Sequence, residues 1–472
     1  MMFETPQPPR DTDRVRTLRS RAKLGAVVAG VLAAAPFAAN ALPVIPNVVG
    51  FGVDTPAGRG GTVYRVTNLN ESGAGSLKEC VAASGPRVCV FEVSGVIRLT
   101  TDLHIRNPYI TIAGQTAPSP GIFLRGAGLQ INTSDVVVQH IRIRVGDDPQ
   151  GPAFGNRDAL KIDAGSSTSR LKNIVVDHCS FAWALDETVS VWELWNDVTL
   201  SNNIIAEGLH ERSDGGTSGY GLLLAQTGGG RATVIGNLMA HNYARNPVVR
   251  SYDSVIVNNV VYNAAWQAAS LASQGGVVTN SAVVGNVFIK GPDTNGHDPV
   301  WIRTDAFPLP PASKVYVSDN QAFGYAKVTT SAWSFVNSDV ATSIMSSAAP
   351  IWPRGLTPMP TQGDVALSNV LKYAGARPAD RDVVDARIVK SVRDRNGRII
   401  NCVSPDGSAR CSKNAGGWPA LAQNRRALTL PSNHNAVTSS GYTNLELWLH
   451  DMAAEVEGRA AGAVPRPPLL LE

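Results

Sequence analysis

The stretch DVTLSNNIIAEG, residues 197–208, contains two short apolar runs separated by the polar residues SNN. The same plan of a β-branched run, a polar pair and a second apolar run recurs at intervals of about 20 to 40 residues. The other clear copies are NIVVDHCSFAW (173–183), ATVIGNLMAHN (232–242), SVIVNNVVYNA (254–264) and AVVGNVFIKG (282–291), and weaker copies lie at 136–146 and 315–324. Self-similarity at this period indicates a repeat architecture.

Each copy is interpreted as two short strands joined by a corner that carries an asparagine. The equivalent corner residues are Asn203, Asn237, Asn259, Asn286 and Asn320. One coil cannot bury its apolar face alone, so several must stack, and the stacked amides can then hydrogen-bond one another. Asn also tolerates the left-handed conformation that such a corner can need. A β-sandwich would require tight Asn-Gly or Asp-Gly turns, which are scarce here. The sequence therefore predicts an all-β parallel β-helix (solenoid) over residues 42–345.

Beyond the repeats the apolar pattern becomes helical. We expect helices within 364–376, 380–395 and 442–458, surrounded by Pro- and Gly-rich coil. Residues 346–472 are predicted to form a C-terminal extension of coil and helix that packs on the β-helix and covers its exposed C-terminal edge.

The first 41 residues have the order of a signal peptide. A basic stretch (14–23) precedes an apolar run (24–38) and the small-residue sequence ANA (39–41). The apolar run is short for a membrane span, although an uncleaved anchor is the alternative. We expect a secreted protein, extracellular or periplasmic. Without this leader the chain is nearly neutral. The positive net charge of the full sequence therefore does not argue for nucleic acid or membrane partners, and any cationic site must be local.

The five cysteines fit an exported protein. Cys80 and Cys89 are nine residues apart, as are Cys402 and Cys411, which predicts two local disulfides. Cys179 stands alone beside His178. It is interpreted as a buried, inert thiol, with a catalytic nucleophile as the alternative.

Polar residues that could carry chemistry interrupt successive repeats. The candidates are Asn156, Asp158 and Asp163 in GNRDALKID, Asp186 and Glu187 in WALDETVS, Arg245 and Arg250 in AHNYARNPVVR, and His210 in the insert AEGLHERSDGG. Neighbouring coils stack about 4.8 Å apart, so these groups can face one groove. Carboxylate oxygens suit Ca²⁺, and paired guanidinium groups suit the carboxylates of an acidic sugar. For each acidic residue taken alone, an ordinary solvated corner is the alternative.

Several of these stretches resemble the core motifs of pectate lyases of polysaccharide lyase family 1. They are DALKI (158–162), IVVDHCSFAWALDETVS (174–190), DVTLSNNIIAEGL (197–209) and NLMAHNYARNPVVR (237–250). Flanking stretches at 48–79, 110–118, 416–421 and 441–449 are similar to the bacterial secreted type. The resemblance implies a right-handed parallel β-helix and a Ca²⁺-assisted β-elimination of α-1,4-galacturonan (pectate) that leaves 4,5-unsaturated products.

The resemblance also implies roles for single residues. Arg245 matches the family's catalytic arginine, and Arg250 matches its substrate-gripping partner. His210 stands where many members place a lysine that contacts the substrate. Arginine normally stays protonated, so we expect desolvation, with Arg250 and Ca²⁺ nearby, to favour a transiently neutral Arg245.

The metal site departs from the family pattern. Asp158 and Asp186 match calcium ligands, but Ser190 and Asn156 stand where carboxylates are common. We therefore expect calcium binding that is weaker, that relies on Glu187, or that forms mainly with substrate present. The expected metal ligands are Asp158, Asp186, Glu187 and Asn156.

Two other functions fit the same sequence. A β-helical hydrolase of polygalacturonate would need two carboxylates about 5–9.5 Å apart that flank the bond. A non-catalytic β-helix could bind polysaccharide through Arg245 and Arg250. In each case the expected partner is an acidic polysaccharide, and the chain is expected to act as a monomer.

Overall fold

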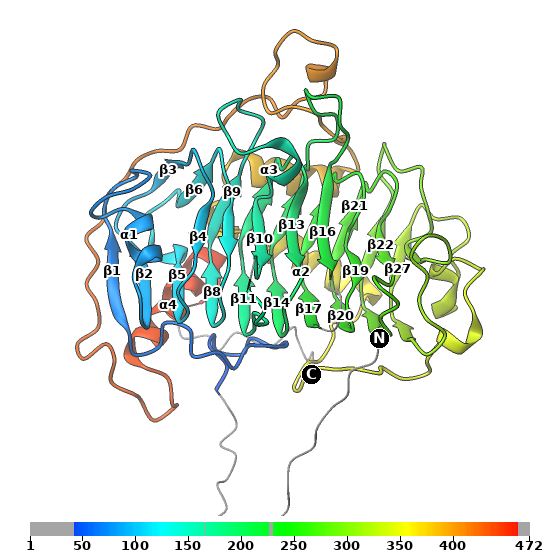
Figure 1. The fold of residues 1–472 in the computed structure, drawn as a ribbon, viewed down its shortest axis with the longest axis horizontal. Coiled ribbons are helices and arrows are strands. Elements are labelled where there is room, and N and C mark those ends of the chain that lie inside the picture. The colour runs from blue at the N-terminus through cyan, green and yellow to red at the C-terminus, as the bar shows by residue number, and fades with distance from the viewer. Residues whose placement is uncertain (1–41, 166, 226–229, 461–472) are drawn as a thin grey trace, which may run out of the picture. The chain divides into compact units, whose positions relative to one another are not determined.

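The computed structural model describes residues 42–165, 167–225 and 230–460 (Figure 1). The predicted signal peptide at 1–41 lies outside these residues. Within the described ranges the chain forms three parallel sheets of ten, nine and eight strands. Along the repeats, successive strands pass from one sheet to the next, so that three strands make one coil. This arrangement is a parallel β-helix, and the fold class predicted from the repeats is confirmed.

The three sheets are named by their order within a coil. The first sheet contains β1 (Thr62–Val66), β2 (Arg87–Phe91), β5 (Ile110–Ala113), β8 (Val136–Gln139), β11 (Ile174–Asp177), β14 (Val198–Ser201), β17 (Arg231–Ile235), β20 (Asp253–Val257), β23 (Asn280–Val284) and β26 (Lys314–Ser318). The second contains β3 (Gly95–Arg98), β6 (Ile122–Arg125), β9 (Ile141–Arg144), β12 (Ser180–Ala182), β15 (Ile204–Ala206), β18 (Leu238–Ala240), β21 (Val260–Tyr262), β24 (Val287–Ile289) and β27 (Gln321–Phe323). The third contains β4 (Leu103–Ile105), β7 (Leu129–Ile131), β10 (Leu160–Asp163), β13 (Glu187–Trp192), β16 (Tyr220–Ala225), β19 (Val248–Arg250), β22 (Ala269–Leu271) and β25 (Val300–Ile302).

Aliphatic side chains stack in columns along the sheets. In the first sheet the parallel register aligns Val138, Val176, Leu200, Val234, Ile256, Val283 and Val317, all of them buried. Burial of each such side chain stabilises the fold by roughly 1.5–3 kcal/mol. Because the strands are parallel and in register, each coil extends the same columns and adds to one continuous core.

The corner asparagines form a continuous hydrogen-bonded ladder, as the sequence predicts. Asn203 donates through Nδ2 to Oδ1 of Asn237 at 2.9 Å, and Asn237 donates to Oδ1 of Asn259 at 2.9 Å. The ladder continues through Asn286 to Asn320, with contacts of 3.0 Å. The backbone N–H of each donating asparagine bonds the same Oδ1 atom. Each buried amide thus finds its hydrogen-bond partner on the next coil. Buried polar groups in folded proteins generally need such a partner.

The left-handed conformation falls on the residue before each ladder asparagine. Asn202, Asn258 and Asp319 have φ values of 55°, 53° and 46°, and Gly236 and Gly285 take the equivalent place at 69° and 66°. Asn, Asp and Gly are the residues that adopt positive φ most readily. The expectation that the ladder asparagine itself takes this conformation is therefore wrong by one residue.

Two predicted helices of the C-terminal region lie along the outer face of the second sheet. They are α2 (Val365–Tyr373) and α3 (Val383–Asp394), and in Figure 1 both lie behind the strands. Their buried residues, which include Leu367, Val370, Val384, Ile388 and Val392, pack against Ile204, Leu238, Val260 and Val287 of that sheet. The apolar outer face of the second sheet is thereby removed from water.

A buried ion-pair network holds α3 in place. Arg144, at the end of β9, donates to Asp382 at 2.6 Å and to Asp385 at 2.7 Å. Ser180 of β12 also donates to Asp385, at 2.7 Å. Asp382 is at the same time the N-cap of α3 and accepts from the backbone of Asp385. The start of the helix is therefore fixed to two consecutive coils.

Residues before 346, and not the C-terminal extension that we expected, contact the last strand at the C-terminal edge of the first sheet. That strand, β26, is contacted by the 3₁₀ turns η3 (Ala332–Phe335) and η4 (Thr342–Ile344). These turns precede residue 346, whereas the later helices pack along the flank. The remaining short turns are η1 (Gly114–Thr116), η2 (Phe154–Asn156), η5 (Gln362–Asp364), η6 (Pro378–Asp380) and η7 (Arg410–Ser412).

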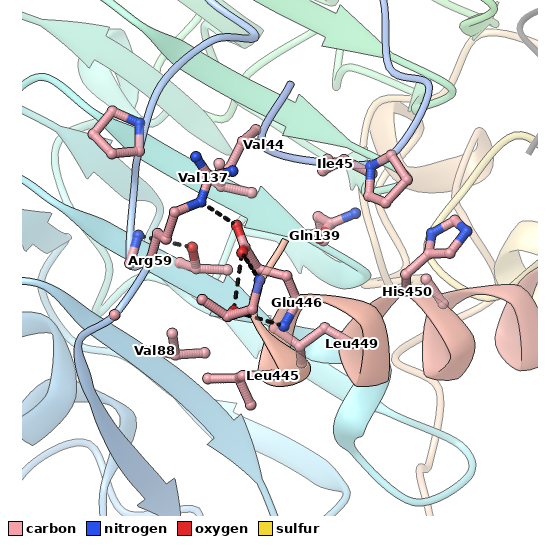
Figure 2. A pocket seen from close by; sticks show the side chains of 17 residues that line it. Val44, Ile45, Arg59, Val88, Val137, Gln139, Leu445, Glu446, Leu449 and His450 are labelled. Carbon is pink, nitrogen blue, oxygen red and sulfur yellow. Dashed lines mark hydrogen bonds and ion pairs between the residues drawn. The ribbon is translucent and has the colours of Figure 1, made fainter. Parts of the chain in front are cut away.

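The third predicted helix, α4 (Asn444–Glu457), returns to the first coils. Its N-terminus has a capping box in which Thr443 and Glu446 bond one another's backbone N–H groups. Leu445 and Leu449 pack against the outer face of the first sheet. As Figure 2 shows, Glu446 also faces Arg59, and the two form an ion pair of 2.7 Å beside a small pocket. Helix α4 thus docks on the first coils of the β-helix.

Both predicted disulfides are present. Cys80, on α1 (Leu77–Ala82), is bonded to Cys89 of β2, and Cys402 is bonded to Cys411. Cys179 is buried, and burial raises the pKa of its thiol, in agreement with an inert side chain. None of the described helices combines the length and apolar character needed to cross a membrane.

Replacement of a central ladder residue should weaken the whole solenoid. Asn237→Ala removes the acceptor of two N–H groups of Asn203 and leaves them buried without a partner. We expect the free energy of unfolding to fall by about 2–5 kcal/mol, measured by chemical denaturation. Asn70→Ala, at an exposed position, is the control and should change it by less than about 0.5 kcal/mol. Equal stability of the two variants would contradict a structural role for the ladder.

Candidate active site

Several of the predicted site residues gather at the edge where third-sheet strands begin. Asp158 lies two residues before β10, and Glu187 is the first residue of β13. Glu187 pairs in register with Tyr220 of β16, and Tyr220 forms a bridge with Ala244, next to Arg245. Residues that lie up to 87 positions apart in sequence therefore occupy consecutive coils along one edge.

Three carboxylates form an acidic cluster at this edge. Asp158, Asp186 and Glu187 each offer an oxygen that lies within 4.8 Å of those of the other two. Asp158 is only 6% exposed. Burial raises its pKa to about 7, and the charge of Asp186 adds to this, while the hydrogen bond from Ser190 acts against it. Burial also raises the pKa of Asp186. Anionic oxygens held this close are a donor set that a hard divalent cation fits.

Ser190 supports this cluster instead of leaving a gap in it. Its Oγ donates to Oδ2 of Asp158 at 2.5 Å, and the backbone N–H of Glu187 donates to Oδ1 at 3.2 Å. The serine that replaces an expected ligand therefore orients an existing one. Asn156 lies on the η2 turn with an exposed side chain, and Asp163 lies at the other end of β10, where it pairs with Lys161 at 3.3 Å.

Arg245 faces the acidic cluster. Its guanidinium group forms an ion pair with Glu187 and lies over the ring of Tyr220, 3.8 Å from the ring centroid. Burial lowers the pKa of Arg245 to about 10, and the charge of Arg250 contributes. The proton of this arginine is thus held less tightly than usual. The pairing with Glu187 depends on side-chain orientation, which the sequence pattern did not indicate.

The loop that carries Arg245 is fixed by the two adjacent coils. Arg245 has φ of +63°, and its carbonyl accepts from the backbone of Leu222 at 2.6 Å. The backbone N–H of Asn246 donates to Ala268 on the next coil at 3.0 Å, and its side chain donates to the carbonyl of Gln267. The Asn246–Pro247 peptide bond is cis. The hydrogen bonds of Arg245 and Asn246 hold the loop backbone against both neighbouring coils, and the Arg245 side chain contacts Glu187 and Tyr220.

Arg250 belongs to a second, cationic part of the third sheet, at the ends of its strands and not at their beginnings. It ends β19, and its guanidinium group lies 4.5 Å from the ring centroid of Phe307. Burial lowers its pKa, and so does the charge of Arg303. Continuing the strand register by one residue places Arg250, Ala272 and Arg303 in one column. Arg303 was not predicted as a site residue, although it follows the strand-like stretch VWI.

His210 begins a row of aromatic side chains along the coils. Its Nδ1 donates to the carbonyl of Ser218 at 2.9 Å, and its ring stacks on Tyr243 with centroids 4.1 Å apart. The row continues through Tyr243, Trp266, His297 and Trp301. Trp266 is 39% exposed. Sequence reasoning missed this row because its members are scattered through loops. The available signal was that Tyr243, Trp266 and His297 lie three to five residues before third-sheet strands and that Trp301 lies within one.

Comparisons with known proteins agree with this architecture. Residues 120–307 match the family described as "Right handed beta helix region", so the predicted right-handed parallel β-helix is confirmed. The crystal structure of jun a 1, the major allergen from cedar pollen, has a similar fold, with a TM-score of 0.50 and 17% sequence identity over 68% of this chain and 91% of that one.

The sequence is similar to curated proteins over most of its length. It is 34% identical over 438 residues to "Probable pectate lyase C" of Aspergillus flavus, which covers 88% of this chain and 94% of the relative. It is 34% identical over 449 residues to "Probable pectate lyase C" of Aspergillus fumigatus, which covers 91% and 98%. Both relatives are fungal, so the narrower bacterial type stays a prediction. On this identity and coverage, the chain belongs to the pectate lyase family.

Proposed function

We propose that this protein is a pectate lyase that cleaves α-1,4-linked galacturonan by β-elimination at the edge of the third sheet. One observation carries the proposal: Arg245, with its lowered pKa, faces a cluster of three carboxylates. Elimination beside a uronate carboxylate needs a base and a neighbouring cation site. Here Arg245 directly contacts Glu187, a member of the acidic cluster.

In this proposal Arg245 is the base. It removes the proton from C5 of the sugar, and that electron pair forms the C4–C5 double bond. The bond from C4 to the glycosidic oxygen breaks, and the oxygen leaves with the bonding pair and takes a proton from water. Burial and the nearby charge of Arg250 lower the cost of a neutral guanidine at Arg245. Glu187 opposes this while it is paired with Arg245, because an adjacent anion stabilises the protonated form.

Asp158, Asp186 and Glu187 would hold Ca²⁺, and Asn156 is the more remote candidate ligand. Bound there, Ca²⁺ would neutralise the uronate carboxylate and stabilise the negative charge that develops when the C5 proton leaves. Glu187 is shared between the two halves of the site, since its carboxylate can face either the cation or Arg245. Ser190 keeps Asp158 oriented in both arrangements.

The substrate is proposed to extend over the cationic column and the aromatic row. Arg250 and Arg303 suit successive uronate carboxylates, and His210 lies at the near end of the aromatic row. The exposed Trp266 suits contact with a sugar ring. We further propose that the protein is exported and monomeric. Two disulfides fit an oxidising compartment, and light scattering would measure the oligomeric state.

Digestion of polygalacturonate distinguishes the possible reactions. We expect ultraviolet absorbance to increase as the conjugated unsaturated product forms. EDTA should abolish this increase, and added Ca²⁺ should restore it. A hydrolase would release reducing ends without this absorbance. A binding module would retain polygalacturonate without release of product. A panel with methyl-esterified pectin and other uronans would define the substrate.

Arg245→Lys tests the proposed base. Lysine keeps a positive charge but has a different reach and basicity, so we expect kcat to fall by about 10²–10⁴-fold with a small change in KM. Arg231→Lys, at an exposed position in the first sheet, is the control and should keep kcat within about twofold. Turnover of Arg245→Lys near that of the unmodified protein would rule out the assignment.

Asp158→Asn tests the acidic cluster without reliance on activity. Loss of one buried anion should weaken Ca²⁺ binding by about tenfold or more, measured by calorimetry. The raised pKa means that the Asp158 anion destabilises the calcium-free fold above its usual pKa range. The calcium-free variant should therefore be at least as stable as the unmodified protein at pH 8. Asp163→Asn, on the same strand but outside the cluster, should leave Ca²⁺ affinity unchanged. Equal affinities of the two variants would contradict the proposed site.

A further inference from the structure

A second cluster of ligating side chains lies at a different corner of the coils from the candidate active site. His140 and His178 occupy the corner between the first and second sheets on consecutive coils, at φ of 57° and 47°. Their rings stack with centroids 5.2 Å apart. Asp177 ends β11, and Glu457 is the last residue of α4, the helix that docks on this side. Two coils and the C-terminal helix therefore meet at this point.

The four side chains present a compact mixed set of nitrogen and oxygen donors. One ligand atom from each lies within 4.8 Å of the others, and all four residues are buried. Oε1 of Glu457 is 3.6 Å from Nε2 of His140 and 3.6 Å from Nδ1 of His178, and that Nδ1 atom is 2.8 Å from Asp177. Tetrahedral Zn²⁺ with bonds of about 2.0–2.1 Å separates its ligands by about 3.3 Å. The observed separations lie on both sides of this value.

The hydrogen bonds of His140 leave a nitrogen that lacks a partner. Its Nδ1 lies 2.9 Å from the carbonyl oxygen of Ala376, which can only accept, so Nδ1 carries the hydrogen. In the neutral ring Nε2 then presents a lone pair. That atom is buried without a hydrogen-bond partner among the described residues, and it faces the Glu457 carboxylate. Two acceptors facing each other in the interior repel unless a cation lies between them. Nε2 of His178 is also buried and unpartnered.

Neighbouring side chains fix the two carboxylates. Asp177 accepts from Ser201 at 2.7 Å, from Asn202 at 3.1 Å and from Gln139 at 3.2 Å. The other oxygen of Glu457 pairs with Arg459 at 3.0 Å. Such outer contacts orient ligands at metal sites. They leave Oε1 of Glu457 directed toward the two histidines.

We propose that His140, Asp177, His178 and Glu457 form a structural Zn²⁺ site that fastens the end of α4 to the β-helix. Two imidazoles and two carboxylates in a closed, four-donor site suit Zn²⁺, whereas Ca²⁺ takes six to eight oxygen ligands. The site is therefore chemically distinct from the acidic cluster at Asp158. The Arg59–Glu446 pair holds the other end of α4, so the helix would be attached at both ends. The ion binds as α4 docks and closes the site.

The test uses the full chain carrying Asp158→Asn, so that the acidic cluster competes less for the added metal. After chelation, Zn²⁺ alone is added, free ion is removed by gel filtration, and the bound metal is measured by mass spectrometry. We expect about one Zn²⁺ per chain and a higher unfolding temperature. Co²⁺ in place of Zn²⁺ should give the intense visible absorption of a tetrahedral site.

Glu457→Gln removes one ligand with little change of shape, and Glu455→Gln, exposed on the same helix, is the matched control. We expect Zn²⁺ affinity to fall by about tenfold or more only in the first. Absence of bound Zn²⁺ and of the Co²⁺ spectrum in the otherwise unmodified chain would overturn the proposal, in favour of a metal-free network of histidines and carboxylates. Equal Zn²⁺ affinity in the two variants would overturn it as well. The Co²⁺ spectrum of the parent chain decides the matter even if Glu457→Gln does not fold.

Discussion

Parallel, in-register stacking of coils is the constraint on which the rest of the molecule depends. Every coil leaves backbone N–H and C=O groups that only its neighbours can satisfy. The ladder from Asn203 to Asn320 adds a side-chain contact that a shift in register would break. Because the register is fixed, Asp158, Glu187 and Arg245 come together, although the strands and loops of the intervening coils separate them in sequence. The chemistry at the third sheet is therefore a result of stacking and not of local sequence.

Much of the fold could be predicted because its signals repeat. A polar residue that recurs within apolar runs identified the ladder, and helical periodicity identified α2, α3 and α4. The left-handed corner was misplaced by one residue, since Asn202 and Asn203 are chemically equivalent in sequence. The docking of α3 could not be predicted, because it depends on Arg144 meeting residues 238 positions later in the chain.

The candidate site could be predicted as a group of residues but not as a set of contacts. Position before third-sheet strands was enough to bring Asp158, Asp186 and Arg245 together. The hydrogen bond from Ser190 and the pairing of Glu187 depend on rotamers, which no spacing indicates. Arg303 was missed since it stands outside any stretch that resembles the family's motifs.

The path of the C-terminal region has a consequence for the growing polypeptide. Apolar residues on the outside of the second sheet, such as Ile204 and Leu238, are covered by α2 and α3, which follow them by more than 100 residues in sequence. Until α2 and α3 have been synthesised, the coils can stack, but the apolar outer face of the second sheet is exposed to water. A chain truncated after the last coil would leave this apolar face exposed, and we expect it to aggregate. The residues of α2 and α3 are thus required before the stacked coils lose their exposed apolar surface.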